Sequence, residues 1–247
     1  DQWAKSFDLS YEDENGENQF CHQTTFGMSE RLLGAIVGLH GDDSGLILPP
    51  AVSPIQVVIM PIATHISDDV LVYSNKIKKD LEECGIRTKI DDRNIRPGNK
   101  HYHWEIKGVP IRLEIGPKDI SKEQCIISLR TGGKEILPLT DLPSSILSSL
   151  DIISEILRKR ANASYREMVL QLPNSTISDG TLTFNEPLNE GIVYEFPFDG
   201  NDADAEILEK TSGLTLLGEC EGSYKEPRPC IMTGKLTTKK QHLAKMY

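Results

Sequence analysis

The chain has 247 residues, of which 38% are hydrophobic and 26% are charged, and its formal net charge is −10. This composition is typical of a globular protein and excludes a collagen-like, low-complexity or wholly disordered chain. No apolar run approaches the roughly 18 residues that a membrane helix needs, so we expect no contact with a membrane.

Five cysteines are scattered along the chain, at positions 21, 84, 125, 220 and 230. An odd and scattered set argues against a disulfide framework and for a reducing, cytoplasmic setting. The amino end shows no signal peptide, because it lacks a basic head and an apolar stretch. The chain begins with Asp in mid-pattern rather than with Met, so we expect it to be a fragment.

The charge is unevenly distributed. Residues 76–134 contain 14 Lys and Arg against 9 Asp and Glu, whereas the rest of the chain contains 13 against 28. An acidic protein with a basic centre could bind a polyanion there and repel it elsewhere. The alternative is an ordinary solvated helix-and-strand surface, and charge alone favours that alternative.

The first 50 residues predict a strand over 18–26, ending at Gly27, and then a helix with Ser29 as its N-cap. This helix is apolar on all sides, which predicts that it is buried. A short strand is expected over 45–48, where Pro49 and Pro50 stop it.

The middle of the chain predicts a β-α-β unit and therefore a partly parallel sheet. A strand over 55–62 is followed by a helix that Ser67, Asp68 and Asp69 open, with apolar residues spaced 3, 4, 4 and 3 from Val70 to Cys84. A strand over 87–90 completes the unit. Further expected elements are a helical segment at 101–107, strands at 109–115 and 125–129, a hairpin turn at Gly132–Gly133 and a long helix over 142–168.

Beyond residue 171 the pattern is weaker. It predicts a strand over 191–198, a short acidic helix over 203–211 and another strand over 214–217. Residues 235–247 resemble a basic tail.

Arg31 is the sharpest chemical signal in the sequence. It follows a strand and a glycine turn and lies in the first turn of a helix, where backbone N–H groups and the helix dipole favour an anion. An arginine held there can bind a phosphate through two parallel hydrogen bonds. The alternative, equally weighted, is an ion pair with Glu30 or with an aspartate elsewhere.

The stretch around this arginine, Gln23–Gly34, reads Gln-Thr-Thr-Phe-Gly-Met-Ser-Glu-Arg-Leu-Leu-Gly and resembles motif 3 of the class II aminoacyl-tRNA synthetases. Two later stretches, Gly41–Pro50 and Trp104–Asp119, resemble the prolyl-tRNA synthetase family specifically. The ending Ala244–Tyr247 is similar to that of the archaeal and eukaryote-like branch of this family. The resemblance covers nearly the whole chain and is strongest up to about residue 160.

The resemblance implies an α/β fold in three parts. Residues 1–52 would be the last part of a class II catalytic domain, residues 53–160 an anticodon-binding domain with a five-stranded mixed sheet, and residues 161–247 a small α+β C-terminal domain. Motifs 1 and 2 would precede Asp1, so the chain would be about half of an enzyme.

The implied activity is that of a proline–tRNA ligase, in which ATP with Mg²⁺ activates proline and the prolyl group passes to tRNA(Pro). The full-length enzyme would be a homodimer. The alternative is a synthetase-derived tRNA-binding or accessory module without catalysis. Arg31 and the intact ending at Tyr247 favour the enzyme, whereas the missing motifs 1 and 2 leave the accessory interpretation open.

The resemblance also implies roles for individual residues. Arg31 matches the catalytic arginine that holds the γ-phosphate of ATP, although Glu30 replaces the usual Thr before it, and Gln23 lies on the strand lining the ATP site. Thr25 and Phe26 match the floor of the proline pocket, where the family more often has Ser-Trp. The positions that read the two guanines of proline anticodons are matched by Glu105, Arg112, Lys118 and Lys134.

These anticodon positions carry suitable chemistry. A carboxylate accepts hydrogen bonds from guanine N1–H and N2–H₂, and Arg or Lys donates to O6 and N7. Trp104 could stack on an unpaired base, but packing in the core under the sheet is at least as good an interpretation.

Two further expectations concern metals. His101 and His103, near Asp91 and Asp92, could bind a metal, but histidines in a polar stretch are more often solvated or hydrogen-bonded. The resemblance implies a C-terminal zinc site of four cysteines, and here only one thiolate remains, so we expect no bound zinc. The four matching positions are Asp199, Asp204, Cys230 and Thr233.

The final residue, Tyr247, completes the implied sites. In the family it folds back towards the catalytic domain, so we expect its ring to be buried and its carboxylate to pair with a cation.

Overall fold

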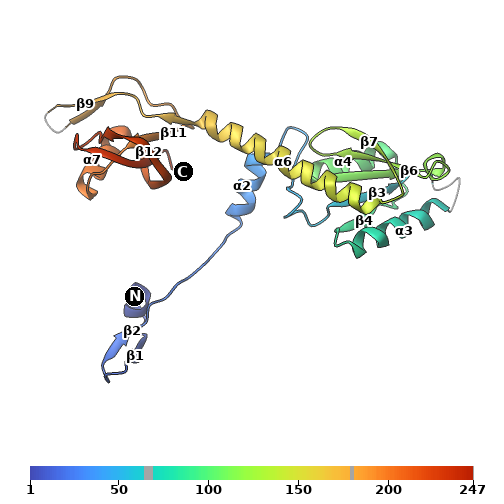
Figure 1. Cartoon of the computed structure of the whole chain (residues 1–247), viewed down its shortest axis with the longest axis horizontal. Helices are drawn as coiled ribbons and strands as arrows, with labels where there is room; N and C mark the ends of the chain where they lie inside the picture. The colour runs from blue at the N-terminus through green and yellow to red at the C-terminus, as the bar shows by residue number, and fades with distance from the viewer. Residues whose placement is uncertain (64–68, 179–180, 247) are drawn as a thin grey trace. The chain divides into compact units, whose positions relative to one another are not determined.

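The computed structural model describes residues 1–63, 69–178 and 181–246. It divides into two compact units, Asp1–Ile153 and Ser154–Tyr247, each of which is considered by itself (Figure 1). Helices and both parallel and antiparallel strand pairs occur. The predicted α/β class is therefore confirmed.

The first unit begins with two small elements and a helix. A short helix α1, Gln2–Ser6, precedes a hairpin of β1, Ser10–Glu12, and β2, Asn18–Phe20. The predicted strand over 18–26 is thus wrong beyond Phe20, because the partner strand supplies only three residues for pairing. Residues 21–29 have no regular secondary structure.

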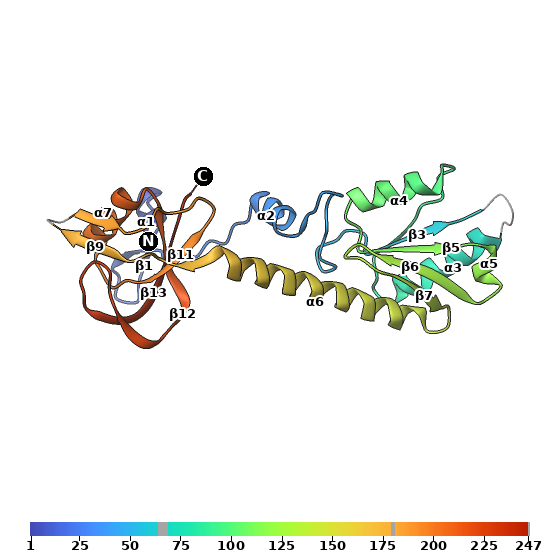
Figure 2. The ribbon, with the colours of Figure 1, turned by 90° about the horizontal axis from the view of Figure 1, so that it is seen from above.

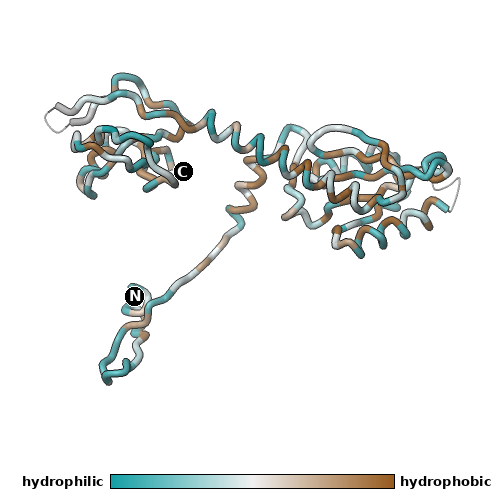
Figure 3. The backbone as a smooth tube through the Cα atoms, viewed as in Figure 1, coloured by the Kyte–Doolittle hydropathy of each residue, from teal (hydrophilic) through white to brown (hydrophobic). Residues whose placement is uncertain are grey.

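Helix α2, Arg31–His40, is predicted correctly in type but wrongly in burial. None of its residues is buried, and Leu32, Leu33 and Leu39 are more than half exposed. Figure 3 shows the helix as a strongly hydrophobic segment. An apolar helix is buried only when other residues cover it, and the described residues of this chain do not cover α2.

A five-stranded mixed sheet forms the centre of the first unit, in the order β4-β3-β5-β6-β7. Strands β4 and β5 pair in parallel with β3, whereas β6 and β7 are antiparallel, which confirms both the β-α-β unit and the hairpin. The strands are β3, Val57–Pro61, β4, Thr88–Ile90, β5, Ile111–Ile115, β6, Gln124–Leu129, and β7, Lys134–Pro138.

Helices cover both faces of this sheet. Figure 2 shows α4, Pro97–Ile106, on one face and α3, Asp69–Glu83, on the other, and a short α5, Pro117–Ile120, follows β5. Strand β3 lies under both helices and is buried at every position. The predicted opening residues of α3, Ser67 and Asp68, lie outside the described residues.

The strands beyond β3 alternate in burial, as half-covered strands should. In β5, Ile111, Leu113 and Ile115 are buried, whereas Arg112 and Glu114 point to the other face and are partly exposed. By its register Arg112 shares a face with Val58, which packs against Trp104 of α4. The charged side of β5 is therefore the α4 side.

The segment Gly45–Leu48 is not a strand, contrary to prediction, because it pairs with a helix end rather than with a sheet. The Leu46 N–H donates to the Ile106 carbonyl at 3.0 Å, and the Leu48 N–H donates to the Gly108 carbonyl at 3.2 Å. The approach is so close that a Cβ on Gly108, which has φ +69°, would lie 2.6 Å from the Leu46 oxygen. Only glycine fits this backbone.

The long helix α6, Leu142–Met168, has the predicted bounds. In the second unit the main sheet has the order β12-β13-β11-β8, and a separate hairpin joins two further strands. The elements are β8, Val169–Gln171, β9, Ser175–Ser178, β10, Thr181–Phe184, β11, Val193–Pro197, α7, Asp202–Ser212, β12, Thr215–Pro229, and β13, Leu236–Ala244.

Two sequence predictions for this unit are corrected. The expected basic tail over 235–247 contains β13, which pairs with both β12 and β11, and the expected strand over 214–217 extends to Pro229. The apolar core includes Tyr194, Phe196 and Leu208. The side chain of Ile207, an apolar residue of α7 next to Leu208, is exposed and does not join this core.

Asp91, directly after β4, fixes α4 on the sheet. Its carboxylate is 1% exposed and accepts hydrogen bonds from Arg93 Nε at 2.8 Å and from Trp104 Nε1 at 2.7 Å, and its carbonyl accepts one from Lys100 Nζ at 2.8 Å. Arg93, with help from the Trp104 N–H, holds the pKa of this carboxyl far below its usual range, against the opposing effect of burial.

We expect Asp91→Asn to lower the free energy of unfolding at pH 7 by about 1–3 kcal/mol, because it weakens buried charge-assisted hydrogen bonds. The folded-state pKa is depressed, so this stabilisation is present above the unfolded pKa of about 3.9 and declines as the pH falls below it. Urea unfolding of both proteins at pH 7 and pH 3 measures the effect. A difference between the two proteins that is the same at both pH values would contradict the assignment.

Candidate nucleic-acid interface

Charged side chains gather on the α4 side of the sheet. Arg112 and Glu114 come from β5, Lys134 from the start of β7, and His101 and Glu105 from α4. Arg112 NH1 lies 3.6 Å from Glu105 Oε2, and Glu114 Oε1 lies 3.6 Å from His101 Nε2 and 3.7 Å from Lys134 Nζ. We call these five residues the charged cluster.

Two atoms of the charged cluster lack hydrogen bonds. Arg112 Nε and Glu114 Oε1 are buried and have no hydrogen-bond partner among the described residues. Buried polar atoms are normally hydrogen-bonded, so Arg112 Nε retains a donor, and Glu114 Oε1, which lies in two long ion pairs, retains capacity as an acceptor. Ile136, on the same face by its register with Ile126, is 63% exposed beside the cluster.

The charged cluster has the chemistry needed to read a guanine. Carboxylates can accept from N1–H and N2–H₂ of an unpaired base, and a guanidinium or ammonium group can donate to O6 and N7. An exposed apolar side chain nearby offers a surface for a base ring.

The structure brings together three of the four residues predicted from the resemblance, namely Glu105, Arg112 and Lys134. The fourth, Lys118, is exposed in the first turn of α5 and forms no hydrogen bond or ion pair with the other three. Glu114 and His101 were missed as members of the site. Their signal was available, because Glu114 lies two residues after Arg112 on a strand and His101 one helical turn before Glu105.

Trp104 is a core residue rather than a stacking platform. It is 3% exposed, packs on Val58 and Met60, and donates its N–H to Asp91. A base cannot stack on a ring covered in this way. The rings of His103 and Trp104 are perpendicular, with their centres 4.9 Å apart. Burial is the main cause that lowers the pKa of His103, and the nearby cations Arg93 and Lys107 lower it further.

Arg130, at the end of β6, joins the segment after α2 to the charged cluster. Its side chain is 4% exposed, and it donates to both carboxylate oxygens of Asp42, to the Gly45 carbonyl and, through Nε at 3.1 Å, to the Glu105 carbonyl. The Arg130 hydrogen bonds lower the pKa of Asp42 to about 2. The buried Arg130 guanidinium group therefore links the backbone at Glu105 to the Asp42 carboxylate.

The residues that the resemblance assigns to ATP and proline are not gathered into a pocket. Gln23, Thr25 and Phe26 lie in the irregular segment before α2 and are exposed, Phe26 by 93%. Arg31 is exposed at the start of α2, where its backbone N–H meets Ser29 Oγ at 3.4 Å. The described residues place no carboxylate in an ion pair with Arg31.

Two of the four positions that match the family's zinc ligands, Asp199 and Thr233, contact Cys230, but the chemistry of the four does not fit zinc. Cys230 Sγ accepts a hydrogen bond from the Asp199 N–H at 3.3 Å, and Asp199 pairs with Lys239 at 2.9 Å. Asp204 caps α7 by accepting from the Asn201 N–H at 3.0 Å. One thiolate with two committed carboxylates does not make a structural zinc site.

The Cys230 thiol is instead held by hydrogen bonds. Burial raises its pKa, but donors from Thr233 and from the backbone of Asp199 outweigh burial and lower the pKa overall. Thr233 therefore acts here as a hydrogen-bond donor to sulfur. Among the residues described, no three His, Cys, Asp or Glu side chains group closely enough to hold a metal ion, around His101 and His103 or elsewhere.

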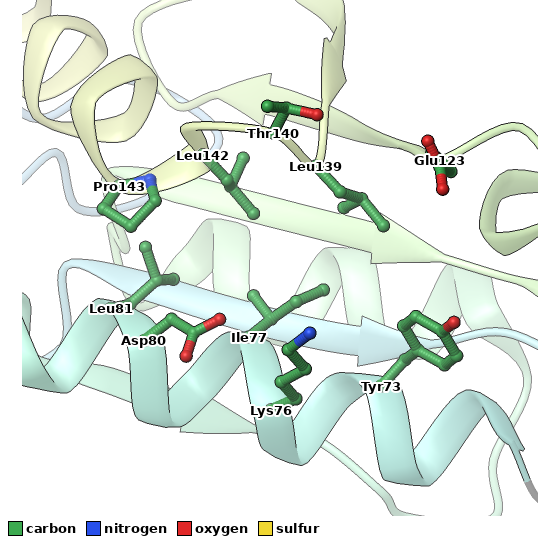
Figure 4. Close-up of a pocket in the computed structure, with 10 residues that line it drawn as sticks. All are labelled: Tyr73, Lys76, Ile77, Asp80, Leu81, Glu123, Leu139, Thr140, Leu142 and Pro143. Carbon is green, nitrogen blue, oxygen red and sulfur yellow. The ribbon is translucent and has the colours of Figure 1, made fainter.

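A separate cavity of about 270 Å³ lies on the α3 side of the sheet. Figure 4 shows Ile77 and Leu81 of α3 facing Leu139 and Leu142 across it, with Tyr73 at one end. It opens on the opposite face from the charged cluster and does not extend it.

Two other sequence expectations can be placed. Within the parts of the chain that the structure describes, no helix has both the length and the apolar character of a membrane span. All five cysteines are free thiols. The site expected at Tyr247 lies outside the described residues.

Comparison with known protein families identifies the domain that carries the charged cluster. Residues 56–149, which contain the sheet and the charged cluster, match the anticodon-binding domain family. This part of the chain is therefore similar to the anticodon-binding domain family.

The particular relatives are proline–tRNA ligases. The chain is 38% identical to that of Methanococcoides burtonii, over the whole chain and 51% of the relative, and 37% identical to that of Thermococcus kodakarensis, over 94% of the chain and 49% of the relative. A crystal structure of prolyl-tRNA synthetase from Cryptosporidium parvum, complexed with halofuginone and AMPPNP, matches 99% of the chain and 51% of that protein, at 30% identity and a TM-score of 0.86.

The resemblance to the prolyl-tRNA synthetase family is thus confirmed. The chain is homologous to proline–tRNA ligases and spans about half the length of the relatives that it matches.

We expect the purified chain to contain far less than one zinc per molecule and a chelator to leave its unfolding midpoint unchanged, because a single thiolate cannot supply the binding energy of a structural site. Elemental analysis and thermal unfolding measure this. The variant Asp199→Cys/Asp204→Cys/Thr233→Cys should gain zinc, because it restores the four cysteines that the resemblance implies, and the matched triple serine variant should not. Near-stoichiometric zinc in the unaltered chain would refute the expectation.

Proposed function

We propose that the chain is the carboxyl-terminal half of a proline–tRNA ligase and that its charged cluster reads the guanines of the proline anticodon. The observation that carries this proposal is the meeting of Glu105, Arg112, Glu114 and Lys134 on one open face of a domain of the anticodon-binding family. Lys118 would contribute from α5. The partners are tRNA(Pro), proline and ATP with Mg²⁺.

The amino-terminal segment would belong to the catalytic domain. The apolar sides of α2 are open here, and the relatives have about as much chain again as this one. We propose that the remaining half covers α2 and that this packing brings Gln23, Thr25 and Phe26 to the ATP and proline sites. Arg31 would then bind the γ-phosphate, where its charge favours the developing pyrophosphate.

We further propose that residues 1–52, 53–160 and 161–247 are the parts of the catalytic, anticodon-binding and C-terminal domains. The full-length protein would be a homodimer that acts in the cytoplasm, where the five free thiols are stable. Tyr247 would fold back to a cation of the catalytic domain.

The second candidate is a tRNA-binding accessory module without catalysis. It is favoured by the exposure of Arg31, Gln23, Thr25 and Phe26, which form no pocket in the described part of the chain. The two candidates differ in one measurement, proline-dependent pyrophosphate exchange by the full-length protein, which only the ligase catalyses.

In the full-length protein, we expect Arg31→Ala to abolish most proline-dependent pyrophosphate exchange, because a lost phosphate contact costs about 3–4 kcal/mol at the transition state. We expect Arg112→Ala to leave exchange nearly unchanged and to lower charging of tRNA(Pro) by about 1–3 kcal/mol, the cost of one base contact.

Lys79→Ala is the matched control, because Lys79 lies on α3 and pairs with Glu83 on the helix surface. It should change neither activity. An equal loss of pyrophosphate exchange in Arg112→Ala and Arg31→Ala would show that the assigned division of roles is wrong.

We expect residues 1–247 alone to bind tRNA(Pro) and to form no prolyl-adenylate, because the ATP site needs groups from both halves of the enzyme. Binding by filter retention and adenylate formation by thin-layer chromatography test this. Adenylate formed by the isolated chain would overturn it.

A further inference from the structure

A hollow of about 300 Å³ lies on the other side of α4 from the charged cluster. It is lined by Lys89 of β4, by Arg93 after that strand, and by His103, Trp104 and Lys107 at the end of α4. None of these residues is needed for base reading as proposed above. We call this cavity the basic hollow.

Two ammonium groups of the basic hollow share one indole ring. Lys107 Nζ lies 5.3 Å and Lys89 Nζ 5.7 Å from the centre of the Trp104 ring. Among the described residues no carboxylate forms an ion pair with either lysine, whereas Lys78, Lys79 and Lys159 each pair with a glutamate. Both ammonium groups therefore add positive charge to the lining of the hollow, and an anion bound there would be attracted to both.

The acidic residues of the basic hollow do not fill this role. Both carboxylate oxygens of Asp91 are taken, one by Trp104 and Arg93 NH2 and the other by Arg93 Nε. Asp92 is the second carboxylate in the lining, and its exposed side chain forms no ion pair with a described residue. Lys89, Arg93 and Lys107 together still outnumber the two carboxylates.

The sheet register places the basic hollow in line with the charged cluster. Lys89 pairs with Val58, Val58 with Arg112, Arg112 with Ser128, and Ser128 with Lys134. Lys89, Arg112 and Lys134 therefore occupy one row on one face, each about 10 Å from the next because they are two strands apart. Trp104 of α4 packs on Val58, between Lys89 and Arg112, so one RNA strand that meets both the hollow and the charged cluster would pass over α4.

We propose that the basic hollow binds a backbone phosphate of the same RNA whose bases meet the charged cluster. This rests on the proposed function. Lys89 and Lys107 bind the phosphate oxygens, and Trp104 positions both lysines and contacts no base. Asp91 and Arg93 keep the indole in place. The contact carries affinity without sequence preference, because every nucleotide has the same phosphate.

The test uses the whole 247-residue chain and an anticodon stem-loop RNA of tRNA(Pro), with binding measured at several salt concentrations. We expect Lys89→Ala/Lys107→Ala to weaken binding about tenfold and to reduce the slope of log affinity against log salt by about 1, as for one lost phosphate contact. The same loss is expected on a stem-loop whose two anticodon guanines are replaced. Arg112→Ala should instead reduce the preference between the two RNAs.

Two control variants test whether the effect depends on the positive charges of Lys89 and Lys107 or only on the total charge of the chain. Lys89→Arg/Lys107→Arg keeps both cations and should keep the salt slope. Lys78→Ala/Lys79→Ala removes two cations from α3, on the opposite face of the sheet, and should also keep it. An unchanged slope in Lys89→Ala/Lys107→Ala, or an equal reduction in the α3 control, overturns the proposal.

Trp104 fluorescence provides a readout in the hollow itself. In a Trp3→Phe background Trp104 is the only tryptophan, and we expect the stem-loop to change its emission in the chain but not in Lys89→Ala/Lys107→Ala. If the unaltered chain binds no stem-loop, the proposed function fails. If Trp104 emission then responds to inorganic phosphate alone, the hollow is a site for free phosphate. If it responds to neither phosphate nor RNA, the hollow is not an anion site. Either outcome overturns the proposal that the hollow binds a phosphate of the RNA backbone.

Discussion

The hydrogen bond from the Trp104 indole to Asp91 is the interaction on which the charged face depends. It joins the middle of α4 to the end of β4 and so fixes the rotation of the helix about its own axis. With that rotation set, His101 and Glu105 point towards β5, and His103 and Lys107 point towards β4. A helix free to turn by one residue would move all four side chains away from their partners.

Arg130 provides the second constraint, at Glu105, the residue that follows Trp104 in α4. It holds the Glu105 carbonyl and the Asp42 carboxylate together, where Gly45 and Gly108 allow two backbones to touch. The segment that follows α2 is therefore part of the sheet domain in its packing, although the resemblance places it with the catalytic domain.

Local signals in the sequence predicted elements whose partners lie close by. The bounds of α6, the β-α-β unit and the Gly132–Gly133 hairpin all follow from periodicity and turn residues. Elements that depend on distant partners were mispredicted: β13 looks like a basic tail until β11 and β12 enclose it. For the site, the resemblance supplied Glu105, Arg112 and Lys134, whereas Glu114 and His101 were missed although their spacing to Arg112 and Glu105 places them on the same strand face and helix face.

The open apolar sides of α2 have a consequence for the chain in solution. Leu32, Leu33 and Leu39 together form a surface that can adhere to the same surface of another molecule. At low ionic strength the net charge of −10 keeps molecules apart, but the Debye length falls to about 8 Å at 0.15 M salt and this repulsion weakens. Added salt therefore promotes aggregation of the isolated chain, and a chain shortened to remove α2 would stay dispersed.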